Sequence, residues 1–191
     1  MKSEKKWSTK NALWVLLYVV LYVVMSVIVC VFGAIHPFFF VCYQITAGLL
    51  VTGVAAKAFD KIRAFGVAAC LSCGMLLAFF AMQDANLWHC VPVIVIAVLA
   101  EIVRMIFKYG SAGNLIASVI MTFSTFGYYG QIWFNRDYTY KCAVEEMPGG
   151  YADTLMNCSP AWAFSVVLII GIAVAVVIYA ITKKLFRFEQ Q

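Results

Sequence analysis

Long apolar runs separated by short polar breaks set the pattern of this chain. A helix needs roughly 20 apolar residues to cross the hydrocarbon core, whereas the strands of a membrane barrel have about 10 residues of alternating polarity. The pattern therefore predicts an all-α membrane protein of six transmembrane helices, forming a single integral membrane domain over residues 1–191. The predicted spans are 11–33, 37–56, 64–82, 90–107, 112–134 and 161–182.

Composition agrees with lipid as the main solvent. The chain is 64% hydrophobic and 12% charged, whereas soluble domains have about 25% charged residues. Exposed apolar patches larger than a few hundred Å² normally mark an interface or a membrane. We expect lipid around most of the surface, and the sequence carries no long basic or acidic tail that would indicate a nucleic-acid partner.

The distribution of basic residues predicts the topology. Six spans place both termini on one side of the membrane, and twelve of the fourteen Lys and Arg residues lie on that side. Only Arg136 and Lys141 lie on the other side. Because basic residues accumulate in cytoplasmic segments, we expect both termini in the cytoplasm. The long polar loop 135–160, between the fifth and sixth helices, is then extracellular.

No group of residues in the sequence points to catalysis. The Gly-rich phosphate loop of nucleotide hydrolases and the His-Glu-x-x-His metal motif are both missing, and the acid pair Glu145-Glu146 lies in the outer loop. We therefore expect no enzyme, no catalytic residue and no intrinsic cofactor.

Polar and aromatic residues at the outer ends of the spans form the candidate ligand site, which loop 135–160 would cover as a lid. Ligand pockets are mostly apolar with a few converging polar groups, but aromatic residues also gather at the membrane interface, and both interpretations stay open. The ligand-binding candidates are His36, Tyr43, Gln44, His89, Tyr128, Gln131, Trp133, Asn135, Arg136, Tyr151 and Trp162.

Two cysteines and one pair of opposite charges add smaller hypotheses. Cys142 and Cys158 lie in the outer loop, where an oxidising exterior permits a disulfide; they are either bonded or free. Glu101 and Arg104 share one helical face, which indicates either an ion-paired helix end or a docking surface for a partner.

Several short motifs resemble one transporter class. They are Phe32-Gly33 with Pro37, Ala100-Glu101-Ile102, Tyr151-Ala152-Asp153-Thr154-Leu155, and Pro160-Ala161-Trp162. With six spans and both ends inside, the chain resembles the substrate-binding S component of an energy-coupling factor (ECF) transporter, and within that class the MptD-like, or Trep-Strep, group. The Ala-x-x-x-Ala pattern common in the first span of S components is missing here, so the resemblance assigns no docking face for the coupling subunit.

The resemblance implies a subunit in a bacterial plasma membrane that captures a micronutrient from outside. It implies as partners a coupling transmembrane subunit and two cytoplasmic ATPases of an ABC-type importer. Among substrates we favour haem over a vitamin-like compound: iron would bind His36 or His89, and propionates would meet Arg136 with Lys141 nearby. The alternative is a non-transporting assembly or sensor subunit whose outer loop binds a protein.

Overall fold

Helices make up all of the regular secondary structure in the part of the chain that this computed structural model describes, residues 7–188. The all-α expectation is therefore confirmed. The elements in chain order are α1 (Thr9–Ile35), α2 (Pro37–Val41), α3 (Tyr43–Lys61), α4 (Val67–Ala81), α5 (Leu87–Ile106), α6 (Ser111–Met121), the 3-10 helix η1 (Thr122–Thr125), α7 (Phe126–Tyr129), α8 (Gln131–Phe134), α9 (Arg136–Glu146), α10 (Tyr151–Cys158) and α11 (Ala161–Leu185).

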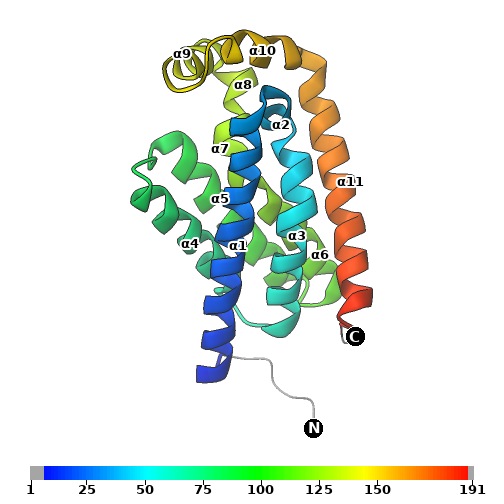
Figure 1. Cartoon of the computed structure of the whole chain (residues 1–191). Helices are drawn as coiled ribbons and strands as arrows, with labels where there is room; N and C mark the ends of the chain where they lie inside the picture. The colour runs from blue at the N-terminus through cyan, green and yellow to red at the C-terminus, as the bar shows by residue number, and fades with distance from the viewer. Residues whose placement is uncertain (1–6, 189–191) are drawn as a thin grey trace.

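The long helices run along the molecule, and two short ones cross one end of it. In Figure 1, α1, α3 and α11 lie side by side, while α9 and α10 lie across the end that is opposite to the start of α1 and the end of α11. Helix α3 packs against both α1 and α11, and α4 and α5 pack against each other on the other side of α1. The bundle therefore has one end covered by its own helices.

Glycines allow close packing between α3 and α11, the helix pair with the most extensive contact. A Cβ atom on Gly48 would lie 2.6 Å from the carbonyl oxygen of Gly171, and one on Gly171 would lie 2.5 Å from Cγ of Gln44. Such separations leave no room for a methyl group. Small residues that let helix backbones approach are typical of packing inside membranes.

Not all of the six predicted spans are single helices. Within residues 7–188, three helices are long and apolar enough to cross a membrane: α1, α5 and α11. The predicted span 37–56 is interrupted at Cys42, between α2 and α3. The count of six spans therefore stays a prediction, whereas a multi-pass helical membrane protein fits the structure.

The predicted span 112–134 divides into α6, η1, α7 and α8. The Thr122 hydroxyl donates to the Val119 carbonyl at 2.7 Å, and such back-bonding by Thr bends helices. Gly127 lies so close to α5 that a Cβ atom there would be 2.1 Å from the Trp88 carbonyl oxygen. These local hydrogen bonds and contacts replace a straight helix by a bent, irregular one.

The outer segment 135–160 is helical, which corrects the expectation of a loop. Helices α9 and α10 fill most of it, joined by a short turn in which Gly150 adopts φ 82°, a conformation that glycine tolerates best. At 11 and 8 residues, α9 and α10 are too short to cross a membrane, and they lie across one end of the bundle instead.

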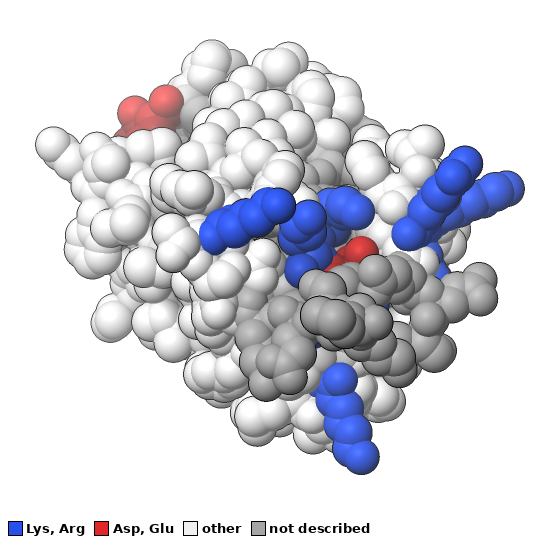
Figure 2. Space-filling view, turned by 90° about the horizontal axis from the view of Figure 1, so that it is seen from below, with Lys and Arg blue, Asp and Glu red and all other residues white. Residues whose placement is uncertain are grey.

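Basic side chains gather on the end of the molecule that lacks α9 and α10. Figure 2 views this end and shows Lys and Arg around it with little acidic surface. The turn between α5 and α6 belongs to the same end, because Lys183 of α11 donates to the Ser111 hydroxyl at 2.9 Å. The basic face consists of Lys10, Lys57, Lys61, Arg63, Lys108, Lys183, Lys184 and Arg187.

A buried ion pair ties the turn between α3 and α4 to α5. Arg104 is 0% exposed and donates to the carbonyls of Ile62 at 2.8 Å and Ala64 at 3.3 Å. Its Nη1 lies 3.6 Å from Glu101 Oε2, while Glu101 Oε1 accepts from the Ala68 amide at 2.6 Å. Both side chains are enclosed by the bundle, so the hypothesis that they dock a partner is corrected: they stabilise the fold from inside.

We expect Arg104→Ala to destabilise the folded protein strongly, because it leaves the buried Glu101 carboxylate without its cation and two turn carbonyls without this donor. Removing one member of a buried ion pair typically costs about 3–5 kcal/mol. Thermal unfolding in detergent should show a large drop in melting temperature. Lys108→Ala, at an exposed position just after the same helix, is the matched control; equal melting temperatures for the two variants would contradict this role.

Candidate functional site

A cavity of about 330 Å³ lies under α9 and α10, at the end opposite the basic face. This volume is at the low end of the roughly 300–1,000 Å³ of small-molecule sites. Its walls come from α2, the turn before α5, α5 itself, and the segments from α7 to α10. The lining residues are Phe40, Asp84, Asn86, His89, Tyr128, Gln131, Tyr138, Thr139, Cys142, Ala143, Glu146, Met147, Tyr151 and Leu155.

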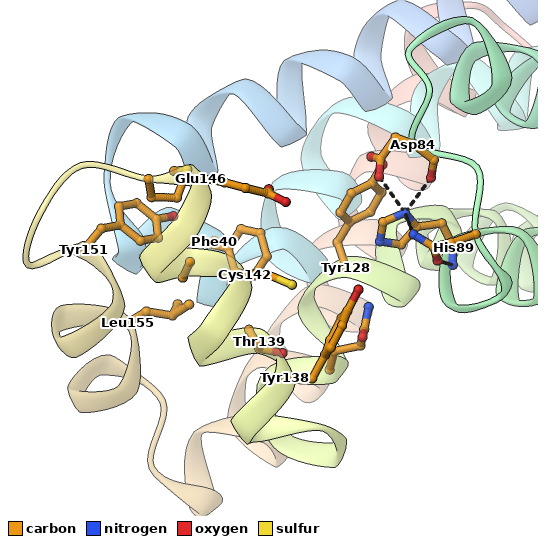
Figure 3. A pocket seen from close by; sticks show the side chains of 14 residues that line it. Phe40, Asp84, His89, Tyr128, Tyr138, Thr139, Cys142, Glu146, Tyr151 and Leu155 are labelled. Carbon is orange, nitrogen blue, oxygen red and sulfur yellow. Dashed lines mark hydrogen bonds and ion pairs between the residues drawn. The ribbon is translucent and has the colours of Figure 1, made fainter.

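One wall of the cavity is a hydrogen-bonded unit of three side chains. The Tyr128 hydroxyl donates to Asp84 Oδ2, and His89 Nδ1 lies 3.2 Å from Asp84 Oδ1 (Figure 3). The rings of His89 and Tyr128 stack with centroids 3.8 Å apart and an interplanar angle of 18°. Since each member holds the other two, this wall is positioned before any ligand binds.

The local sequence explains why His89 sits in this wall. Asn86 is the N-cap of α5, and its Oδ1 accepts from the backbone amide of His89 at 3.0 Å. Asn is among the preferred N-cap residues, so it fixes the first turn of α5. His89 Nδ1 also lies 2.9 Å from the carbonyl oxygen of Asp84, which holds the turn 84–86 against the imidazole.

Helix α9 supplies the facing wall. Tyr138, Cys142 and Glu146 are spaced four residues apart, which places them on one face of a helix, and all three line the cavity. In Figure 3 the Glu146 side chain extends from α9 toward Tyr128 and Asp84. The two acidic side chains thus approach the cavity from opposite walls.

Tyr151 fastens α10 to the end of α1. Its hydroxyl donates to the Gly33 carbonyl at 2.5 Å. That carbonyl would normally accept from residue 37, but Pro37 has no N–H. Burial raises the pKa of Tyr151 to about 12, so the hydroxyl keeps its proton and remains a donor near neutral pH. The roof of the cavity is therefore anchored at the break between α1 and α2.

The structure brings four of the eleven predicted ligand residues to the cavity: His89, Tyr128, Gln131 and Tyr151. Three others hold the fold together. Tyr43 donates to the Cys30 carbonyl at 2.7 Å, and Trp133 Nε1 donates to the Pro160 carbonyl at 3.1 Å. Gln44 is 0% exposed and pairs with side chains inside the bundle, donating to Thr122 at 2.8 Å and accepting from Tyr129 at 2.7 Å.

The remaining four candidates lie at helix ends. His36 is exposed and caps α2, its Nδ1 accepting from the Phe38 amide at 3.2 Å, and Asn135 is the N-cap residue of α9. Arg136 donates to the carbonyls at the end of α10, and Trp162 is 68% exposed. None of these four lines the cavity.

Asp84, Tyr138 and Glu146 line the cavity but were not among the predicted ligand residues. For Tyr138 and Glu146 the available signal was their spacing with Cys142, which becomes visible once 136–146 is taken as a helix.

Cys142 lines the cavity and Cys158 ends α10. Both are free thiols in the structure, and the disulfide between them stays a prediction.

Comparisons with known proteins give one match. Searches of curated proteins and of solved structures return none. One family model, described as a hypothetical bacterial integral membrane protein (Trep_Strep), matches residues 9–189. This match confirms the Trep-Strep part of the sequence resemblance and covers nearly the whole chain. The chain thus belongs to the Trep_Strep family of bacterial integral membrane proteins.

Proposed function

We propose that this protein is the substrate-capture subunit of an ECF-type importer in the bacterial plasma membrane. The observation that carries the proposal is the cavity of about 330 Å³, with one wall set in advance by the hydrogen bonds among Asp84, His89 and Tyr128. Such a preformed, partly aromatic cavity suits a small molecule.

The orientation follows from charge. Basic residues favour the cytoplasmic side, and they gather on the end that lacks α9 and α10. With that end inside, the cavity opens toward the exterior, where a capture subunit meets its substrate. The proposal includes six membrane-spanning segments, with both termini in the cytoplasm.

Energy for uptake would come from partners. The sequence has no Gly-rich phosphate loop, so we assign ATP hydrolysis to two cytoplasmic ATPases joined through a coupling membrane subunit, as the S-component resemblance implies. The chain itself would bind the substrate and, as the resemblance implies, topple in the membrane to release it.

Haem is a weaker substrate candidate than a smaller ligand. Of the residues assigned to haem, only His89 lines the cavity, while Arg136 and Lys141 line a separate surface pocket. A compact vitamin-like molecule needs only the aromatic and polar groups that do lie together.

The topology is tested by labelling. In a chain whose seven native cysteines are replaced by Ala or Ser, we introduce single cysteines by Lys108→Cys or Glu145→Cys, both at exposed positions. A membrane-impermeant maleimide applied to intact cells should label only the second. Labelling of the first from outside would reverse the proposed orientation.

Filling the cavity should abolish capture. Cys142→Trp places a large ring in the cavity, so a compound that copurifies with the native chain should be lost, as followed by mass spectrometry of the extracted protein. Lys141→Trp is the matched control, because it lies next in sequence but outside the cavity. Retention by Cys142→Trp equal to the native level would place the binding site elsewhere.

Coupling is tested in vesicles. We expect the purified chain to bind its compound alone but to accumulate it only when the coupling subunit, the ATPases and ATP are present. ATP-independent accumulation by the chain alone would exclude the ECF mechanism. Specific binding with no accumulation in the complete assembly would favour the non-transporting alternative.

A further inference from the structure

We infer that the captured molecule is flat and carries a protonated nitrogen group rich in hydrogen-bond donors. This inference rests on the proposed capture function and concerns the same cavity. It follows from three properties of the lining residues: the sign of their charge, an acceptor without a partner, and the arrangement of their rings.

The charge of the lining is negative. Asp84 and Glu146 line the cavity, and within residues 7–188 no Lys or Arg does. The nearest basic residues of α9, Arg136 and Lys141, line a different pocket on the surface. Asp84 is already bonded to Tyr128 and His89, so Glu146 is the carboxylate that a ligand can meet. A carboxylate there attracts a cation and repels an anion, and the effect is stronger in a cavity than on an open surface.

Gln131 adds a buried acceptor with no partner. It is 7% exposed, and its Nε2 donates to the Gly127 carbonyl, which fixes the other amide atom as oxygen. That Oε1 is buried and has no hydrogen-bond partner among the described residues. Oε1 itself is enclosed rather than open to the cavity, so a ligand reaches it only if the Gln131 side chain turns. Because an unpaired buried acceptor is unfavourable, a ligand N–H that bonds to the turned amide would stabilise the complex.

Aromatic rings define the shape. Tyr128 stacks on His89, and Phe40 and Tyr138 also line the cavity. Flat ligands stack on such rings, and aromatic faces also attract cations. Carboxylates, an amide oxygen and ring faces together select a planar cation with several N–H donors.

Three probes of equal shape separate charge from ring stacking: benzamidine, which is a planar cation, benzamide, which is neutral, and benzoate, which is an anion. Binding is measured by calorimetry on the full chain in detergent, after release of any copurified compound. We expect benzamidine to bind roughly tenfold or more tightly than benzamide, as a charged hydrogen bond implies, and benzoate to bind least.

A matched pair of variants locates the effect. Glu146→Gln removes a cavity carboxylate whose side chain is exposed enough that folding is unaffected, and it should weaken benzamidine binding roughly tenfold. Glu145→Gln makes the same charge change one residue away, outside the cavity, and should leave binding unchanged. Equal effects of the two variants, or tighter binding of benzoate than of benzamidine, would overturn the inference.

The copurified compound gives a second readout that distinguishes the two proposals. A released compound with a protonated nitrogen group supports the inference. An anionic compound, displaced by Cys142→Trp, overturns the ligand class but leaves the capture function standing. No released compound and no binding of any probe would overturn the capture function itself.

Discussion

This structure depends on one constraint: backbone carbonyls that lose their helical N–H partner at a helix break need another hydrogen-bond donor. In lipid, every backbone polar group needs a partner within the protein, and this chain interrupts its helices repeatedly. At several of these breaks a side-chain donor from another element bonds to a backbone carbonyl. Tyr22 donates to the Met121 carbonyl at the end of α6, Tyr151 to the Gly33 carbonyl before Pro37, and Arg104 to the Ile62 carbonyl after α3.

Side-chain bonds to backbone carbonyls also hold the helices that cover the cavity, α9 and α10. The Tyr151 bond that compensates for Pro37 also holds α10 against the end of α1. At the other end of α10, Arg136 donates to the carbonyls of Met156 at 2.7 Å and Ser159 at 3.0 Å. Helices α9 and α10 are too short to be stable alone in water, since isolated helices need about 12–15 residues. They are held by these long-range bonds, so the position of Glu146 depends on them.

The sequence predicted the features that depend on local pattern. Apolar length identified α1, α5 and α11, and the basic residues identified one face of the bundle. It missed the features that depend on distant partners. Gln44 looks like a site residue because it is polar at a span end, but its orientation toward Thr122 and Tyr129 is set by packing between segments about 80 residues apart. The polar composition of 135–160 likewise gave no sign that tertiary bonds would make it helical.

Side-chain donors that bond to backbone carbonyls are not free to bond to a molecule in the cavity. At this end of the molecule, Tyr43, Trp133 and Arg136 all donate to carbonyls, so these groups are committed to the fold. The polar groups that remain at the cavity include the Glu146 carboxylate, which is an acceptor, and the Tyr138 hydroxyl, which can donate or accept. If the cavity is the proposed capture site, a ligand that supplies hydrogen-bond donors suits the Glu146 carboxylate, because nearby donors of the protein are bonded to its backbone. On that proposal, the selectivity of the site is a consequence of how the chain satisfies its own backbone.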